Sequence, residues 1–269
     1  LARSEQRTAA AQRHAEDLLK STGQPNDKAD RSECGMAWTP SSVSTWHTID
    51  ATLFQRSDPG SAAPGEPILW AKTRIPKAHV LYRAGDRTEA LYAVRFGSCK
   101  TELLSKNGQE QVVGFYMVGD VIGADGIASE VHTCQATALE DTEVLRLPLD
   151  SLEEIARHDP SFGPDFHKLL SQETARAHAL MLVLGLMRAE QRLAFFLVDL
   201  SQRYQARGYS SCEYVLRMSR QEIGSYLGLK LETVSRLFSR FHREGVVQID
   251  GRNIVLRDRP ALIQRAEGG

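Results

Sequence analysis

The stretch of sequence that decides the fold is Ser219–Phe241, SRQEIGSYLGLKLETVSRLFSRF. Ser219 and Glu222 have the spacing of a capping box, which predicts that a helix begins here. Gly228 comes where this helix should end, because glycine readily takes the left-handed conformation of a helix C-terminus. A second helix is predicted from about Lys230. The stretch therefore predicts two short helices joined by a tight turn.

The second predicted helix has two distinct faces. Its apolar face is expected to hold Val234, Leu237, Phe238 and Phe241. Its opposite face holds Glu232, Ser235, Arg236, Ser239, Arg240 and Arg243. Arginines together with a carboxylate and hydroxyl groups suit the base edges and phosphates of a DNA major groove. A plain solvated helix face is the alternative interpretation.

The residues after this helix favour the DNA interpretation. Gly245 is expected to end the helix, and two β-type runs follow over 246–249 and 253–256. Between them stands Asp250-Gly251, a dipeptide typical of a two-residue hairpin turn. Helix, turn, helix and hairpin together predict a winged helix-turn-helix.

The sequence resembles the Crp/Fnr regulators, and among them the Fnr branch, whose recognition helix carries E-x-x-S-R. Glu232, Ser235 and Arg236 fill that motif, and KNGQEQVVGFYMVGDVIG and AEQRLAFFLVDLSQRY are similar as well. The resemblance runs roughly from Arg74 to Leu256. It implies that the three motif residues read the bases of a TTGAT-like palindrome. The residues expected to contact DNA phosphates are Ser219, Arg240 and Arg243.

The expected fold class is α+β. Short β-type runs broken by turns over 67–159 predict a sandwich or barrel, and the resemblance implies a jelly-roll sensor domain of the cyclic-nucleotide-binding type. A dimerisation helix over 160–187 and a winged helix-turn-helix domain over 188–258 should follow. Residues 1–66 form an extension whose role the sequence leaves open, and 259–269 form a C-terminal tail.

Charge is distributed unevenly along a chain whose net charge is only −1. From Arg188 to the end there are 14 Lys+Arg and 9 Asp+Glu, a balance of +5 that leaves −6 for the remainder. A basic C-terminal module fits DNA binding by one end of the chain. No apolar run reaches the roughly 18 residues that span a bilayer, and the polar N-terminus has no signal-peptide pattern. We therefore expect a cytoplasmic protein with no membrane partner.

The sequence contains no G-x-S-x-G, H-E-x-x-H or P-loop motif, so no enzyme activity is expected. Two other classes compete with a DNA-binding regulator. One is an enzyme or ligand-carrying β-barrel with an incidental helical tail, and the other is a ligand sensor that acts through protein contacts alone.

A heptad seam on the helix over 160–187 predicts a partner helix. By resemblance, the partner is the same helix of a second copy, in a parallel homodimer; a helix lying on its own β-domain is the alternative. Oxygen-sensing relatives have an aspartate in place of Ala177, which would oppose dimerisation when buried. We therefore expect a constitutive dimer. The seam consists of Leu170, Thr174, Ala177, Met181 and Leu184.

Cyclic AMP and an iron–sulfur cluster are not expected as cofactors. Family members that bind cyclic nucleotides carry an Arg-Ser or Arg-Thr pair, and the matching stretch GDVIGADGIASEVHTCQATAL has no arginine. A [4Fe–4S] cluster needs four thiolates within reach, but only Cys34 lies in the N-terminal segment and Leu145 stands at the family's β-domain ligand position. The other cysteines are Cys99, Cys134 and Cys212.

A haem- or redox-responsive gas sensor of the same fold is the alternative function. Cys212 is a possible redox thiol ahead of the first DNA-binding helix. The possible axial haem ligands are His79, His132, His167 and His178.

RNA polymerase is the other expected partner. By resemblance, activators of this family touch the polymerase through exposed loops of the β-domain, and the loop KNGQE matches one of them. A plain hairpin turn at Asn107-Gly108 is the alternative. The candidate contact residues are Lys106, Gln109 and Glu110.

Overall fold

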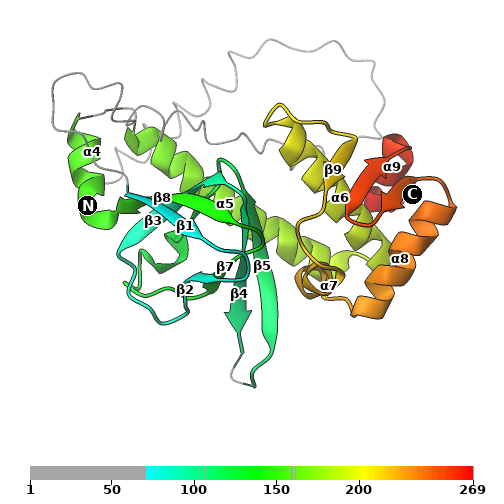
Figure 1. Cartoon of the computed structure of the whole chain (residues 1–269), viewed down its shortest axis with the longest axis horizontal. Helices are drawn as coiled ribbons and strands as arrows, with labels where there is room; N and C mark the ends of the chain where they lie inside the picture. The colour runs from blue at the N-terminus through cyan, green and yellow to red at the C-terminus, as the bar shows by residue number, and fades with distance from the viewer. Residues whose placement is uncertain (1–70, 106, 159, 161, 269) are drawn as a thin grey trace, which may run out of the picture. The chain divides into compact units, whose positions relative to one another are not determined.

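The computed structural model describes residues 71–268 except 106, 159 and 161 (Figure 1). The extension over 1–66 lies outside the described residues, and so do Cys34 and Lys106. Within the described residues, no helix is long and apolar enough to cross a membrane.

Two four-stranded sheets form the β-domain, in the orders β1-β8-β3-β6 and β2-β7-β4-β5. All strand pairs are antiparallel, and most neighbours in the sheets are not consecutive in sequence, as expected of a jelly roll. This confirms the predicted β-domain fold. Its strands are β1 (Ala71–Ile75), β2 (Val80–Tyr82), β3 (Ala90–Phe96), β4 (Ser98–Leu104), β5 (Glu110–Met117), β6 (Val121–Ile122), β7 (Gln135–Ala138) and β8 (Thr142–Pro148).

The side chains that fill this domain come from alternate positions of its strands, since successive residues of a strand face opposite ways. Gly97 makes the turn from β3 to β4 with φ 83°, and a Cβ there would lie 2.6 Å from the carbonyl oxygen of Asp141. Only glycine fits such a turn. The buried residues of this core are Ile75, Tyr82, Val94, Cys99, Ile122, Cys134, Ala136, Ala138 and Val144.

Helices follow the β-domain in the chain. A 3-10 helix, η2 (Leu149–Ser151), and α4 (Leu152–His158) precede α5 (Phe162–Leu186), which is 25 residues long. Leu169 on α5 is buried against the β-domain, whereas Val183 joins the core of the C-terminal domain. The helix predicted over 160–187 therefore exists, and it contributes to both cores.

The C-terminal domain is a winged helix-turn-helix, as predicted. Its three-stranded sheet has the order β10-β11-β9 and lies next to the helices in Figure 1. Buried apolar residues of every helix meet in one core, among them Leu193, Ile223 and Phe241. The elements are α6 (Ala189–Gln205), β9 (Glu213–Val215), α7 (Arg220–Leu227), α8 (Leu231–Arg243), β10 (Val247–Asp250), β11 (Asn253–Leu256) and α9 (Arg259–Glu267).

The structure differs from the sequence interpretation at two places in this domain. Asp250 pairs with Asn253, so the hairpin turn is made by Gly251 and Arg252 rather than by Asp250-Gly251. The residues expected to be a tail over 259–269 include α9, whose Leu262 and Ala266 are buried in the domain core. The apolar pattern of α9 is short, which is why a tail was the natural sequence interpretation.

Candidate nucleic-acid interface and sensor cavity

The helix-turn-helix is built as the sequence predicted. Ser219 Oγ accepts a hydrogen bond from the backbone N–H of Glu222 at 3.2 Å, and the Ser219 N–H donates to Glu222 Oε2 at 2.6 Å. Gly228 ends α7 in the left-handed conformation, with φ 61°. A Cβ on Gly224 would lie 2.6 Å from the carbonyl oxygen of Leu229, so this glycine allows the turn to pack closely on α7. The sequence interpretation missed the role of Gly224.

The two faces of α8 are also as predicted. Val234, Phe238 and Phe241 are buried beneath it. All six residues of the polar stripe are exposed, so a single surface presents carboxylate, hydroxyl and guanidinium groups. These residues are Glu232, Ser235, Arg236, Ser239, Arg240 and Arg243.

Arg240 is engaged by carboxylates at the C-terminal end of α8. Its guanidinium donates to Glu190 at 2.8 Å and to Glu244 at 2.7 Å, and Arg265 contacts the same two carboxylates at 3.0 and 2.6 Å. Among the described residues, no ion pair holds Arg236 or Arg243. Exposed ion pairs add little to stability, so Arg240 can leave these carboxylates at small cost.

Arg220 holds α7 against α8. Its guanidinium carbon lies 3.3 Å from the centre of the Phe238 ring, a cation–π contact, and burial lowers its pKa to about 10. Sequence reasoning missed this residue, because an arginine at the start of a helix normally looks like a solvent-exposed charge.

The predicted dimer seam lies on a face of α5 that this single chain leaves largely uncovered. Thr174, Ala177 and Met181 are exposed, and Met181 is 61 % exposed. Leu170 and Leu184 at the ends of the seam are half-buried. The seam therefore presents methyl groups and a thioether to the outside, with no charge among its members.

The β4–β5 hairpin is bonded to α7. Ser225 Oγ accepts from the backbone N–H of Val112 at 2.9 Å and donates to the carbonyl oxygen of Glu110 at 3.2 Å. Lys100 Nζ lies 3.0 Å from a carboxylate oxygen of Glu222 on α7. The first helix of the DNA-binding motif is thus fixed to the sensor domain by hydrogen bonds between the Ser225 hydroxyl and main-chain atoms of β5, and by an ion pair.

A buried carboxylate joins the β-domain to both long helices. Asp120, which is 3 % exposed, lies 2.9 Å from Arg176 on α5 and 2.8 and 2.7 Å from Arg203 and Arg207. Its carboxylate also accepts from the backbone N–H of Met117 at 2.9 Å. Burial alone would raise the pKa of Asp120, but the three arginines hold it well below its usual range. The sequence did not predict this cluster, because its only local pattern is the spacing of Arg203 and Arg207, one helical turn apart.

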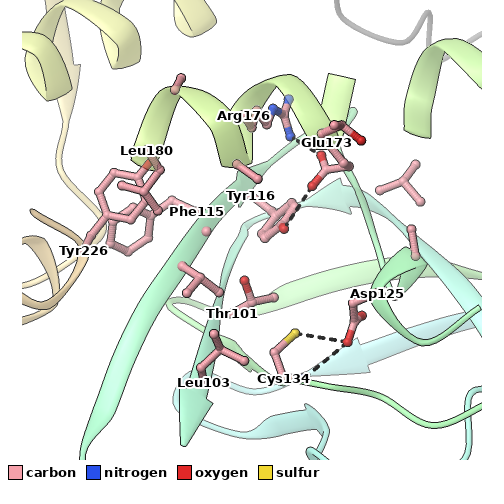
Figure 2. A pocket seen from close by; sticks show the side chains of 18 of the residues that line it. Thr101, Leu103, Phe115, Tyr116, Asp125, Cys134, Glu173, Arg176, Leu180 and Tyr226 are labelled. Atoms are coloured by element: carbon pink, nitrogen blue, oxygen red, sulfur yellow. Dashed lines mark hydrogen bonds and ion pairs between the residues drawn. The ribbon is translucent and has the colours of Figure 1, made fainter. Parts of the chain in front are cut away.

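A cavity of about 470 Å³ lies between the β-domain and α5 (Figure 2). Glu173 and Arg176 of α5 border one side, where Glu173 accepts from the Tyr116 hydroxyl at 3.2 Å. Asp125 and Cys134 lie together on the β-domain side in Figure 2. The cavity therefore has ionisable groups at two separated places, and Leu103, Leu170 and Leu180 are among its lining residues.

Asp125 is in the 3-10 helix η1 (Ala124–Gly126) and accepts several hydrogen bonds. Its Oδ2 receives the backbone N–H of Thr133 at 2.8 Å, the Thr133 hydroxyl at 3.1 Å and the backbone N–H of Cys134 at 3.2 Å. The Cys134 thiol donates to the same oxygen at 3.3 Å. Burial raises the pKa of Asp125, but these bonds, with that from the Thr133 N–H first, outweigh it and lower the pKa overall.

Comparison with known proteins identifies the family. The family model described as Crp-like helix-turn-helix domain matches residues 191–265, and the cyclic nucleotide-binding domain model matches 72–159. The transcriptional regulatory protein btr of Bordetella pertussis is 49 % identical over 74 % of this chain and 82 % of its own length. The chain belongs to the Crp/Fnr family of transcription regulators.

Other relatives and structures agree with this assignment. The fumarate and nitrate reduction regulatory protein of Escherichia coli is 38 % identical over 74 % of this chain and 80 % of its own. The structure of FixK2 from Bradyrhizobium japonicum has a TM-score of 0.67 at 33 % identity and covers 72 % of this chain and 96 % of its own. The chain is thus a DNA-binding transcription regulator and not an enzyme.

The loop expected to touch polymerase in this Crp/Fnr regulator connects β4 to β5. Its backbone is closed by a bond from the Ser105 N–H to the carbonyl oxygen of Gln109, 2.9 Å long. The side chains of Gln109 and Glu110 are exposed, while Lys106 lies outside the described residues. Both described candidates are therefore accessible to a partner.

The described cysteines do not fit an iron–sulfur cluster. Cys99 and Cys134 are buried thiols of the β-domain, whereas Cys212 is exposed and directly precedes β9 of the other domain. Burial raises the pKa of both Cys99 and Cys134 to about 12, which disfavours the thiolate that a metal needs. Within the described residues, no group of three or more His, Cys, Asp or Glu is placed to hold a metal ion.

The four histidines do not converge on one site. His79, His167 and His178 are exposed, and His132 is buried with its ring stacked on Tyr82 at 3.6 Å between centroids. Of the four, only His132 is buried, and its Nε2 has no hydrogen-bond partner within the described residues.

Proposed function

We propose that the chain binds a TTGAT-like inverted repeat as a homodimer and activates transcription by contacting RNA polymerase. The observation that carries the proposal is the exposed row Glu232, Ser235 and Arg236 on α8, backed by a buried apolar face. Arg236 is suited to donate bidentately to guanine O6 and N7, and Glu232 to accept from a base amine. Ser235 contacts a thymine or a phosphate.

The test is DNA binding by an Arg236→Ala variant. We expect a loss of about 1–3 kcal/mol per half-site on the palindrome and relaxed preference at one guanine. Arg74→Ala, which removes an equally positive but remote side chain of the β-domain, is the matched control and should bind like the wild type. Equal losses on the palindrome and on random DNA would refute the base-reading role.

The homodimer is supported by the uncharged, largely exposed seam on α5. Two recognition helices reading half-sites one turn apart must be held about 34 Å apart by a two-fold axis. A paired α5 supplies such an axis. Because no seam residue is charged, association needs no ligand to neutralise a buried charge.

The regulator works, on this proposal, without cyclic AMP, haem or an iron–sulfur cluster. The arginine-free stretch beside the cavity, the buried thiols and the scattered histidines support this view. The absorption spectrum of anaerobically purified protein is the direct check, since haem and iron–sulfur centres absorb visible light. Featureless absorption above the protein band is expected, and a Soret band or a broad charge-transfer band would revive the gas-sensor alternative.

A further inference from the structure

The bonds to Asp125 have the form of an anion-binding site. Two successive backbone N–H groups, of Thr133 and Cys134, point at one oxygen atom, together with the Thr133 hydroxyl and the Cys134 thiol. We call these four donors the cradle. Neighbouring main-chain N–H groups with hydroxyl donors are a common way for proteins to bind phosphate or carboxylate.

The occupant of the cradle is the chain's own side chain. The second oxygen of Asp125 lies 3.4 Å from the Tyr82 hydroxyl and 3.4 Å from His132 Nδ1, so polar groups surround the whole carboxylate. The loop that carries Asp125 is tightly seated, because a Cβ on Gly126 would lie 1.9 Å from Thr88 Oγ1. The backbone next to Asp125 is therefore packed closely against Thr88.

The cradle opens on the cavity that the β-domain shares with α5, as Figure 2 shows for Asp125 and Cys134. It also lies within residues 72–159, which match the model of a cyclic nucleotide-binding domain. A phosphate that entered here would find the four donors already bonded to Asp125, and it would lie next to the negative charge of that carboxylate. Like charges at such distances repel strongly away from bulk water.

We propose that Asp125 is a built-in anion, which fills the cradle in place of a ligand's phosphate or carboxylate group. It holds the loop of η1 against the start of β7 permanently. The β-domain is consequently ordered without a ligand and closed to phosphate-bearing molecules. The proposal deepens the ligand-independent regulation put forward above, but it does not involve the residues that face DNA.

Chemical rescue tests the proposal. An Asp125→Ala variant should unfold at a lower temperature than the wild type in chloride buffer. Formate, acetate or inorganic phosphate at equal ionic strength should raise the melting temperature of this variant by several degrees, because a small anion can bind in the cradle that Asp125 no longer fills. The wild type should gain no more from these anions than from chloride.

Asp141→Ala is the matched control. The Asp141 carboxylate also accepts a backbone N–H, that of Lys77 at 2.9 Å, but it lies outside the cradle. Its variant should respond to the anions like the wild type. Equal responses of Asp125→Ala and Asp141→Ala would overturn the proposal, and so would a saturable rise in wild-type melting temperature with cyclic AMP.

If the Asp125→Ala variant does not fold, an Asp125→Asn variant provides a second test. Asparagine has the same shape without the charge, so wild type should be more stable than the variant at neutral pH. The difference should vanish as the carboxylate of the wild type is protonated in acid. The groups facing Asp125 are Tyr82, His132, Thr133 and Cys134, and all are present in both proteins. A difference that does not change with pH would overturn the role of the charge. DNA binding measured in parallel separates this outcome from a failure of the proposed function.

Discussion

Arg203 on α6 donates to the carboxylate of Asp120, in the turn between β5 and β6, over 2.8 Å. Both side chains are buried, and the same guanidinium group also donates to the carbonyl oxygen of Phe115 at 2.7 Å. This contact connects the first helix of the DNA-binding domain to the sensor domain. With Arg176 and Arg207 it makes Asp120 the meeting point of two helices and one β-turn.

Replacing Asp120 with asparagine should destabilise the protein by about 3–5 kcal/mol, because buried guanidinium groups would lose their counter-charge. Urea unfolding at neutral pH measures this loss. Glu143→Gln is the control, since Glu143 pairs with Arg74 and Arg95 at the surface, and it should have little effect on stability. Similar small losses for both variants would show that the Asp120 cluster adds little to stability.

Acid should weaken the protein through the same carboxylate. The pKa of Asp120 is lowered in the folded state, so its contribution is fully present above the unfolded pKa of about 3.9 and is lost as pH falls. Urea midpoints measured from pH 7 to pH 3 should therefore begin to decrease only as the pH nears that unfolded pKa, and should decrease further below it. The Asp120→Asn protein should have a flatter profile, and parallel profiles would contradict the linkage.

An Ala177→Asp substitution should shift the protein from dimer toward monomer and weaken operator binding, with folding largely kept. The reason is the cost of burying an unpaired carboxylate in the seam. Sedimentation of purified protein at micromolar concentration measures the change. Ala175→Asp is the control, because Ala175 is an exposed residue of the same helix outside the seam. A wild-type protein that sediments as a monomer would refute the constitutive dimer.

Arg243 and Arg240 should differ in their effect on the salt dependence of DNA binding. Removal of Arg243 should reduce the slope of log affinity against log salt by about 0.9 for each phosphate that its guanidinium neutralises. Arg240→Ala should reduce it less, because Glu190 and Glu244 already balance that charge. A Glu244→Gln variant should bind specific and random DNA more tightly by similar factors. Altered sequence preference in Arg243→Ala would contradict a phosphate role.

Substituting the β4–β5 loop should lower transcription and leave DNA affinity unchanged. Lys106→Ala combined with Glu110→Gln removes both charges but keeps the carbonyl oxygen that Ser225 binds. In vitro transcription and a DNA shift assay with the same preparation separate the two effects. Ser225→Ala, which breaks the bonds to α7, is the comparison and should alter DNA affinity. A parallel loss of DNA affinity in the loop variant would argue against polymerase contact.

Local sequence signals predicted the DNA-binding motif well. The Ser219–Glu222 capping box, Gly228 and the two faces of α8 depend on residues within a few positions of one another, so their geometry follows from the chain itself. The burial of α9 could not be predicted in this way. Its apolar residues, Leu262 and Ala266, are buried because α9 packs against α6, and the local sequence of α9 does not indicate that contact.

The ionic contacts were equally hidden from sequence reasoning. Asp120 and Arg203 are separated by 83 residues, and no periodicity connects them. The role of Asp125 was harder still to predict. The sequence showed only that an arginine is missing, and nothing in it indicated that a carboxylate accepts hydrogen bonds from Thr133 and Cys134. Such contacts depend on the jelly-roll crossovers, which bring distant turns to one place.

The bonds between Ser225 and the β5 strand place few limits on which amino acids can occupy positions 110 and 112. The Ser225 hydroxyl bonds only main-chain atoms of Glu110 and Val112, and every amino acid supplies the same carbonyl oxygen. The N–H at position 112 is lost only to proline. The exposed side chain at position 110 can therefore drift, and the buried one at 112 can change within the limits of the core, while the joint between the domains persists. In these two bonds, Ser225 is the only side chain, so the residue types at positions 110 and 112 do not reveal them.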